Sequence, residues 1–364
     1  MGIQVKCEGC GADLVYKPGT TSLTCSYCDH QMAFSEPVSN EQAGKEISLV
    51  DYLRDYAANS KKVVRHVIDC KNCGAETEFD PNQKSGACPF CDSPLVIQEA
   101  HDKNIIRPQG ILPFAVEKQT AKDKFRQWLS KLWFAPTDLK KQITQLDKFT
   151  GIYLPFWTYD CITNSVYIGQ RGDYYYDTVT QRDNAGNTKS KKVRKTRWSN
   201  RQGQVQCNFD DVLVSASQSL PEDKLLALEP WDLKQLVDYS DDYLRGYKTE
   251  TYQIDLKQGY ENAKKIMGAR IKDRVKQDIG GDAQRIVTVK TAYREATFKH
   301  ILLPVWISAY RYRGKLYQIM VNARTGEVQG NRPWSWIKIT ALVITIIAAV
   351  AGIGITIAYF NQAG

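Results

Sequence analysis

Four Cys-x-x-Cys pairs limit what this 364-residue chain can fold into more than any other feature of its sequence. The pairs form two groups of four, and each cysteine of the first group is matched by another 63 residues later. In both groups a glycine follows the second cysteine and an aspartate follows the fourth. The sequence therefore contains an internal duplication. The eight residues are Cys7, Cys10, Cys25, Cys28, Cys70, Cys73, Cys88 and Cys91.

Each group has the composition and spacing of a zinc ribbon. Two Cys-x-x-Cys turns can surround one zinc ion with four thiolates at about 2.3 Å, which leaves no coordination position for water or substrate. A group spans too few residues for a hydrophobic core, so the metal would supply most of its folding free energy. We predict zinc ribbons at 1–36 and 63–100, with one structural zinc ion in each. Iron in a rubredoxin-like site and metal-free redox thiols are the alternatives.

An uncharged segment of 22 residues, Ile339–Phe360, lies near the C-terminus. A helix of this length, at about 1.5 Å per residue, crosses a hydrocarbon core of about 30 Å. Trp334 and Trp336 precede it where an aromatic belt belongs, and Lys338 adds positive charge on the same side. We predict a single transmembrane helix at 337–360 that anchors the chain by its tail in the cell membrane, with its N-terminal bulk in the cytoplasm. A buried core helix is the alternative.

The start of the chain shows no apolar stretch of signal-peptide length. Ten cysteines in such a chain favour metal binding in a reducing compartment over a disulfide framework. This expectation agrees with the cytoplasmic placement of the two groups of cysteines.

The segment 101–335 shows the mixed pattern of an α+β domain, in which helical spacing and strand-like alternation follow one another. The predicted helices cover 121–132, 137–149 and 255–278, and the predicted strands cover 151–180, 192–214 and 285–329.

A second repeat lies inside this domain. The motif Ile152-Tyr-Leu-Pro-Phe-Trp157 resembles Ile301-Leu-Leu-Pro-Val-Trp306, 149 residues later. We infer two copies of a β-unit, with the proline of each motif at a strand start or edge, where its missing N–H does no harm.

Between the two ribbons, 37–62 is predicted to be a linker with a helix over Glu41–Asn59. The predicted fold class is α+β, with two tandem small β zinc ribbons, a mixed domain with a duplicated β-unit, and one C-terminal transmembrane helix.

Positive charge gathers in a predicted hairpin at 172–201, with its turn at 183–186. From Arg182 to Arg201 there are eight basic residues and one acidic residue, a net charge of 8 − 1 = +7. Three interpretations remain open: contact with anionic lipid, contact with nucleic-acid phosphate, or a solvated hairpin whose cations prevent edge-to-edge pairing. The candidate residues for contact with an anionic surface are Lys189, Lys191, Lys192, Arg194, Lys195 and Arg197.

Several motifs of enzymes do not occur in the sequence. It has no Gly-x-x-x-x-Gly-Lys-[Ser/Thr] phosphate loop, no His-Glu-x-x-His and no Gly-x-Ser-x-Gly. The four histidines form no local cluster. The sequence therefore predicts a protein that is not an enzyme, with no catalytic residues and no evident small-molecule substrate.

The ribbons, the apolar tail and several aromatic motifs together resemble a family of bacterial membrane proteins described as TFIIB-type zinc-ribbon-containing proteins. Many members are labelled primosomal protein N′ (replication factor Y), a superfamily II helicase, but the nucleotide motifs of that motor are absent here. The resemblance implies a link to SPFH/band-7 proteins and to phage-shock-type envelope-stress systems. The motifs are Trp133–Pro136, Ile152–Trp157, Arg171–Tyr176, Arg197-Trp198, Phe209–Val214 and Leu303–Trp306.

These observations predict a non-enzymatic, membrane-anchored adaptor whose ribbons recruit protein partners to the cytoplasmic face of the membrane. The alternative is a nucleic-acid-binding zinc-ribbon protein, associated with replication or transcription, that uses the ribbons and the basic hairpin. A binding affinity that falls steeply with salt would favour the alternative.

Overall fold

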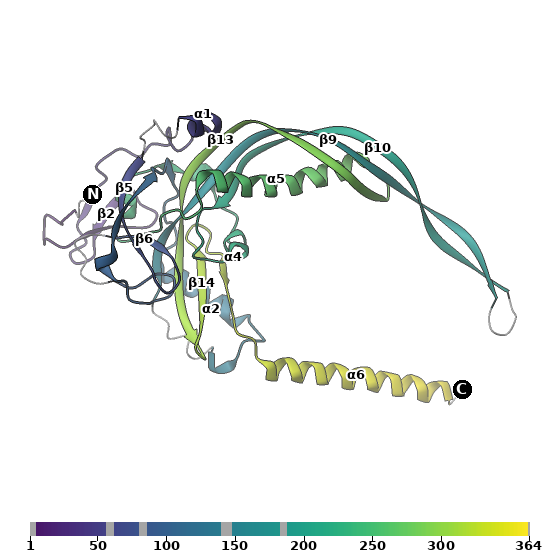
Figure 1. Ribbon diagram of the computed structural model, residues 1–364. Helices are drawn as coiled ribbons and strands as arrows, with labels where there is room; N and C mark the ends of the chain where they lie inside the picture. Colours follow the sequence, from purple (N-terminus) through teal and green to yellow (C-terminus); the bar gives the residue numbers. More distant parts are fainter. Residues whose placement is uncertain (1–4, 56–61, 80–85, 140–147, 183–187, 363–364) are drawn as a thin grey trace.

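The computed structural model describes residues 5–55, 62–79, 86–139, 148–182 and 188–362. The fold is mixed α+β and consists mostly of strands, which confirms the predicted class at this level. One long, curved sheet forms the body, and two small sheets that carry the cysteines lie beside it. A last helix leaves the body near α2 (Lys118–Ser130) and β14 (Lys315–Asn322) (Figure 1).

The central sheet has the strand order β10-β9-β13-β14-β15, and neighbours along this path are antiparallel. The strands predicted from the sequence fall on these elements. Their bounds are β9 (Thr150–Arg182), β10 (Thr188–Ser215), β13 (Ala283–Tyr312), β14 (Lys315–Asn322) and β15 (Val328–Gly330).

The two copies of the proline motif pair directly with each other, because Ile152 of β9 lies opposite Val305 of β13 and Phe156 opposite Ile301. Each long strand also has a short parallel neighbour from the other half of the domain. The order β8–α2–β9–β10 therefore repeats as β12–α5–β13–β14, and the two units exchange their short strands. The bounds are β8 (Gly110–Ile111), α2 (Lys118–Ser130), β12 (Lys248–Thr249) and α5 (Leu256–Ile279).

The tryptophan that ends each motif makes the same hydrogen bond in both units. Trp157 Nε1 donates to Ile254 O at 2.9 Å, and Trp306 Nε1 donates to Val116 O at 2.8 Å. Both acceptors lie one residue before the N-cap of the following helix, α5 or α2. The duplication predicted from six residues therefore extends over the whole β-unit.

The prediction that the motif prolines lie at strand starts or edges is wrong, because both lie inside the long strands. Pro155 O accepts from Ala216 N and Pro304 O accepts from Ala323 N, at 3.0 and 3.1 Å, just after β10 and β14 end. In an antiparallel strand the N–H and C=O of one residue point to the same side. The missing N–H of each proline therefore faces the gap where one neighbouring strand ends and the short strand begins.

Helix α5 confirms the helix predicted at 255–278, and it lies under the curved sheet (Figure 1). Asp255 caps its start by accepting from Gln258 N at 2.8 Å, and Gly280 ends it with a φ of 65°. Its buried positions recur every three or four residues, as the sequence pattern predicted. They are Leu256, Gly259, Ala263, Met267, Ile271, Val275 and Ile279.

Gly259 lets α5 approach the sheet closely. A Cβ at this position would lie 2.5 Å from Tyr159 Oη and 2.8 Å from Trp157 Cδ1, whereas a Cβ at Gly268 of the same helix meets nothing within 4 Å. We expect Gly259→Ala to lower the free energy of unfolding by about 1–3 kcal/mol. Gly268→Ala is expected to raise it by up to about 1 kcal/mol, because Ala favours the helix. Denaturant unfolding measures both, and equal effects would contradict the close contact.

The linker helix predicted over Glu41–Asn59 is much shorter in the structure. Within the described residues only α1 (Leu49–Arg54) is helical, and β4 (Ile47–Ser48) before it pairs with β13. This pairing fixes extended backbone where the helix was predicted, and Ser48 then caps α1. The end of the predicted helix at 56–59 lies outside the described residues, as does most of the helix predicted at 137–149.

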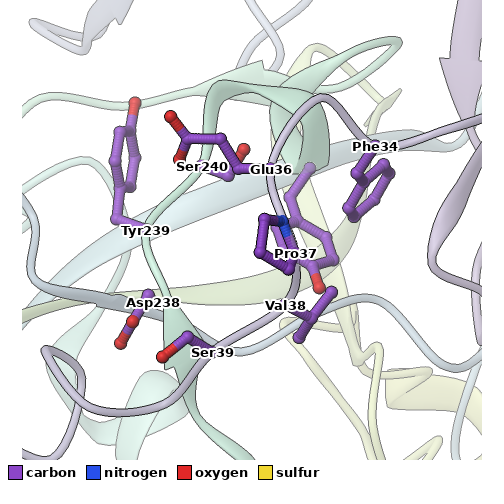
Figure 2. A pocket seen from close by; sticks show the side chains of 9 residues that line it. Phe34, Glu36, Pro37, Val38, Ser39, Asp238, Tyr239 and Ser240 are labelled. Atoms are coloured by element: carbon purple, nitrogen blue, oxygen red, sulfur yellow. The ribbon is translucent and has the colours of Figure 1, made fainter.

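The linker between the cysteine groups also lies against the body. A surface cavity of about 220 Å³ lies between the linker and the body and is lined by Phe34, Glu36–Ser39, Asp238–Ser240 and Tyr243 (Figure 2). Asp238 holds the linker here by accepting from Gln42 N and Ala43 N at 2.8 and 2.7 Å. The short strand β11 (Val237–Asp238), which contributes Asp238 to this cavity, pairs with β8. The short helix α4 (Glu222–Leu226) has Leu225 buried.

The last helix, α6 (Trp336–Gln362), is long and apolar enough to cross a membrane, and its apolar window Trp336–Thr356 is not buried in the body. Its base is held by the loop after α2. Phe134 O accepts from Ser335 N at 2.8 Å, and Ala135 O accepts from Lys338 Nζ at 2.8 Å.

Candidate metal centres

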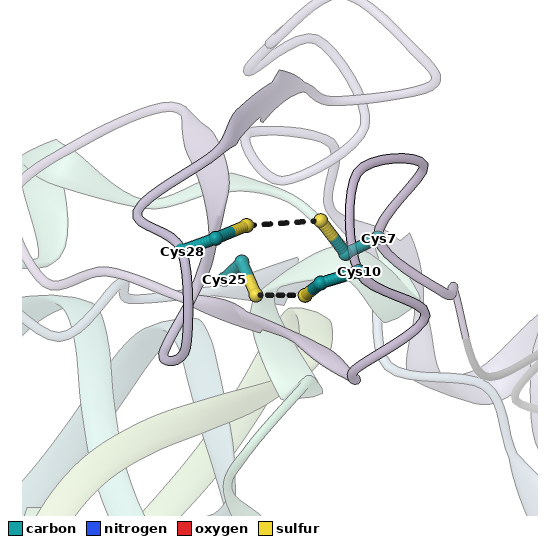
Figure 3. A group of neighbouring side chains, drawn as sticks. All are labelled: Cys7, Cys10, Cys25 and Cys28. Carbon is teal, nitrogen blue, oxygen red and sulfur yellow. Dashed lines mark hydrogen bonds between the residues drawn. The ribbon is translucent and has the colours of Figure 1, made fainter.

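The first cysteine group joins the turns of a three-stranded sheet, which we call module 1. Cys7 Sγ lies 3.5 Å from Cys28 Sγ, and Cys10 Sγ lies 3.5 Å from Cys25 Sγ (Figure 3). All four sulfur atoms are within 4.8 Å of one another. A zinc tetrahedron requires sulfur atoms about 3.8 Å apart, so this group fits a metal ion. The strands are β1 (Leu14–Tyr16), β2 (Ser22–Cys25) and β3 (Gln31–Ala33).

The second group has the same geometry in a second three-stranded sheet, which we call module 2. Cys70 Sγ lies 3.5 Å from Cys91 Sγ, and Cys73 Sγ lies 3.5 Å from Cys88 Sγ. The sheet reaches Ile106, past the boundary at 100 set from the sequence, because its last strand pairs with its first. The strands are β5 (Lys62–Asp69), β6 (Glu76–Glu78) and β7 (His101–Ile106).

The glycine after the second cysteine of each group takes the left-handed backbone conformation. Gly11 N donates to Cys7 O at 2.8 Å and Gly74 N donates to Cys70 O at 2.7 Å, with φ angles of 73° and 74°. The aspartates after the fourth cysteines take the same left-handed conformation, with φ of 57° at Asp29 and 59° at Asp92. Aspartate tolerates this region better than most residues, which explains a repeat that the sequence alone showed without a reason.

The thiolate is the form that binds a metal, and contacts within each cysteine group lower the pKa of some of its thiols while they raise the pKa of others. The N–H groups of Cys28 and Tyr27 point at Cys25 Sγ and lower the pKa of that thiol to about 7. In module 2, the hydrogen bond with the Cys88 thiol lowers the pKa of Cys73 to about 5. Four sulfur donors at this spacing are consistent with one zinc ion in each module, two in all.

The two metal centres differ in exposure. In module 1, Cys10 and Cys28 are exposed, and Tyr27 between the last two cysteines is 89% exposed. In module 2, three of the four ligands are buried and Cys73 is half-buried. Sequence reasoning missed this difference, because the two groups have identical spacing.

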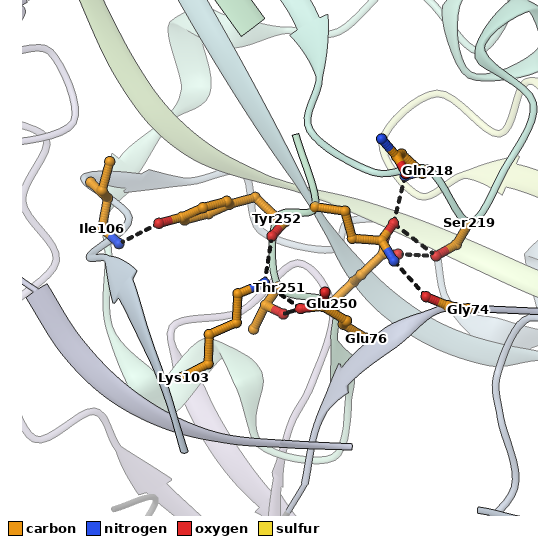
Figure 4. Close-up of polar contacts among 10 residues, drawn as sticks. Gly74, Glu76, Lys103, Ile106, Gln218, Ser219, Glu250, Thr251 and Tyr252 are labelled. Atoms are coloured by element: carbon orange, nitrogen blue, oxygen red, sulfur yellow. Dashed lines mark hydrogen bonds and ion pairs between the residues drawn. The ribbon is translucent and has the colours of Figure 1, made fainter. Parts of the chain in front are cut away.

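Module 2 is fixed to the body by polar contacts from the segment after β12 (Figure 4). Gln253 Nε2 donates to Gly74 O at 2.6 Å, and Thr251 N donates to Glu76 O at 3.1 Å. The Glu76 carboxylate also pairs with Lys103 of β7.

Module 1 contacts the body at the matching place in the other β-unit, the segment after β8. Tyr16 Oη donates to Phe114 O at 3.1 Å, and Gly19 N donates to the same carbonyl at 2.9 Å. Each module therefore rests beside the short strand of one β-unit.

We expect a chelator to remove the two metal ions at clearly different rates. The exposed ligands Cys10 and Cys28 let a chelator reach the first centre in the folded protein, whereas the second centre opens only when module 2 separates from the body. A colorimetric zinc-release assay should show one fast and one slow equivalent, and Cys10→Ser should remove the fast one. Release in a single phase would contradict the difference.

The candidate residues for anionic contact all lie on β10. Five of them, Lys191, Lys192, Arg194, Lys195 and Arg197, have exposed side chains. The side chain of Lys189 and the predicted turn at 183–186 lie outside the described part of the chain.

Sequence reasoning also missed a group of carboxylates on the central sheet. Oxygen atoms of Glu46, Asp160 and Asp210 lie within 4.8 Å of one another. Asp160 is buried opposite bulges in both neighbouring strands, between Phe209 and Val212 and between Arg294 and Thr297. Burial and the hydrogen bond with Glu46 raise the pKa of Asp160 to about 7.

We expect Asp160→Asn to stabilise the protein at alkaline pH. The raised folded-state pKa means that the folded protein binds this proton more tightly than the unfolded chain, so stability falls as pH rises from about 4 to about 7. Asparagine mimics the protonated acid and removes this loss. The variant should melt higher than the wild type near pH 8 and at a similar temperature near pH 4. Asp210→Asn, an exposed neighbour, is the control; an equal gain at both pH values would rule out the linkage.

The two groups of four cysteines are consistent with a zinc-binding protein, and its strand-rich body ends in an apolar helix long enough to span a membrane. No family model matches the chain. It is similar to the uncharacterized protein YdjG of Bacillus subtilis (strain 168), with 25% identity over 350 residues, which cover 94% of this chain and 93% of YdjG.

Proposed function

We propose that this protein is a non-enzymatic adaptor, anchored by α6 in the cell membrane, whose zinc ribbons recruit a protein partner on the cytoplasmic side. The observation that carries this proposal is the unequal exposure of two matched cysteine centres on a body that ends in an unburied apolar helix. Module 2, with three buried ligands, is suited to a structural role, whereas module 1, with two exposed ligands, is suited to contact with a partner.

The turn of module 1 is the best-suited surface for a partner. Tyr27 is a large aromatic side chain held almost fully in water by a rigid metal-bound turn. Exposed aromatic side chains on rigid turns supply much of the binding energy at protein interfaces, because little conformational entropy is lost on binding. The resemblance to TFIIB-type zinc-ribbon membrane proteins adds the expectation that the partner is of the SPFH or envelope-stress type.

The absence of catalytic activity is supported by the chemistry of the centres. Four thiolates complete the coordination of each metal ion, so no position remains for substrate. The cavity beside the linker is lined mainly by aromatic and small side chains, together with Glu36 and Asp238, and Asp238 is already engaged by backbone N–H groups.

In-cell photo-crosslinking tests the proposal. A photoreactive amino acid at position 27 is expected to give protein adducts in the membrane fraction, and the added change Cys10→Ser should abolish them. The control is the same amino acid at Val287, which is 68% exposed on the central sheet. Adducts with nucleic acid at position 27 would support the nucleic-acid-binding alternative, and equal protein adducts at both positions would refute module 1 as the contact surface.

A further inference from the structure

Beyond the first residue of β13, strands β9 and β10 continue alone as a two-stranded arm. Ala283, the first residue of β13, pairs with Gly172, and the arm comprises the described residues 173–182 and 188–197. It projects far from the body (Figure 1). Because side chains alternate along a strand, the register of the two strands assigns each side chain of the arm to one of two faces.

One face of the arm carries cations and aromatic rings but no carboxylate, and we call it the acid-free face. Its cross-strand pairs are Lys192 with Thr178, Arg194 with Tyr176, and Thr196 with Tyr174. The Arg194 guanidinium lies over the Tyr174 ring, 4.3 Å from its centroid, and Tyr176 is 69% exposed.

The opposite face carries both aspartates of the described arm. Lys195 Nζ pairs with Asp177 at 2.6 Å, and Asp173 pairs with Arg171 at 2.9 Å. Arg197 lies over the Tyr175 ring at 5.3 Å. The cations that the sequence presents as one basic run are therefore divided, and part of the charge on this face is neutralised within the arm.

We propose that the acid-free face docks on the anionic lipid headgroups of the membrane that α6 crosses; this inference rests on the proposed membrane anchoring. Tyrosine and arginine side chains with an apolar body and a polar end suit the headgroup layer of a bilayer. Lys192 and Arg194 add attraction to negative lipid without a carboxylate on the same face to oppose it.

The anchor favours lipid over nucleic acid as the occupant. The two cations of this face whose side chains the structure describes, Lys192 and Arg194, give only a weak contact with a freely diffusing polyanion. A helix fixed in the bilayer, by contrast, keeps headgroups at a high effective concentration. In Figure 1 the arm and α6 leave the body toward the same side. Paired strands with charged side chains cannot enter the hydrocarbon. The proposal therefore requires the arm to lie along the bilayer surface, with α6 inclined to the arm more steeply than in Figure 1.

Lipid photo-crosslinking in the full-length protein tests which face docks. The chain is reconstituted in nanodiscs of phosphatidylcholine alone or with added phosphatidylglycerol, and a photoreactive amino acid replaces Tyr176 or, as the control on the opposite face, Tyr175. We expect lipid adducts at position 176 in the anionic discs, with a yield about tenfold lower at position 175 or in neutral discs.

A pair of charge reversals provides the matched control. Lys192→Glu with Arg194→Glu should lower the adduct yield at position 176 about tenfold, whereas Lys191→Glu with Lys195→Glu, the same change in net charge on the other face, should leave most of it. Equal losses in the two variants, or equal adducts at positions 175 and 176, would overturn the inference. Preferential adducts with an added single-stranded oligonucleotide would replace lipid with nucleic acid. Failure of the chain to co-purify with either disc would instead refute the membrane anchoring itself.

Discussion

Replacing Cys91 with serine is expected to destabilise the whole body, not only module 2. Cys91 is a buried ligand, and its neighbour Phe90 is fully buried in the same cluster as Leu303 and Met320 of the central sheet. Phe90 O also accepts from Gln318 Nε2 of β14 at 2.9 Å. Losing the metal therefore releases side chains that form part of the core of the central sheet.

The expected effect is large because two losses combine. The module depends on its metal to fold, and extraction of a buried phenylalanine from a packed core costs about 3–5 kcal/mol. We expect one metal ion per chain instead of two, together with a fall in the melting temperature of the central sheet.

Metal analysis and thermal unfolding followed by near-ultraviolet circular dichroism measure these two effects. Cys207→Ser is the control, since Cys207 lies outside both metal centres and the variant should keep both metal ions. If Cys91→Ser loses a metal ion while the sheet melts at the wild-type temperature, module 2 folds independently of the body and the argument from Phe90 fails.

The two groups of four cysteines that the structure brings together could be predicted from the sequence, because each pair is local and the duplication fixes the spacing between the pairs. The difference in exposure between the two centres could not be predicted from the sequence, since exposure depends on contacts from residues far along the chain. Gln253 and Gln318 hold module 2 through single hydrogen bonds to its backbone, and their types and positions carry no sequence signal for that role.

In the β-unit repeat, too, the local features could be predicted from the sequence and the tertiary contacts could not. Its motif of six residues was visible, and so was the amphipathic pattern of α5. The exchange of β8 and β12 between the units was not, because two-residue strands have no periodicity to recognise. The prediction of a long linker helix was wrong for a related reason. The pairing of Ile47 and Ser48 with β13 is a tertiary contact that overrides local helical preference.

In the basic hairpin, the net charge counted along the sequence does not predict how the charges are distributed over the two faces of the arm. The net charge of +7 was counted from Arg182 to Arg201, a range that leaves out Asp173 and Asp177 earlier in β9. Both aspartates lie on one face of the arm. This asymmetry depends on the cross-strand register, which no count of residues along the chain contains.

Placing two arginines in the middle of α6 is expected to release the protein from the membrane. Ile347 and Val350 lie near the centre of the apolar window Trp336–Thr356. An arginine at this depth adds about 2.5–3.5 kcal/mol to the free energy of insertion. The combined cost of Ile347→Arg and Val350→Arg therefore exceeds the favourable insertion free energy of the remaining apolar residues. The matched control is Trp336→Arg with Ile337→Arg, because the same two charges at the end of the window can reach the headgroups beside Lys338. After a carbonate wash, the central variant should appear in the soluble fraction and the control in the membrane pellet. If both variants remain in the pellet, α6 does not hold the chain by spanning the hydrocarbon core, and the membrane contact must be sought in the body.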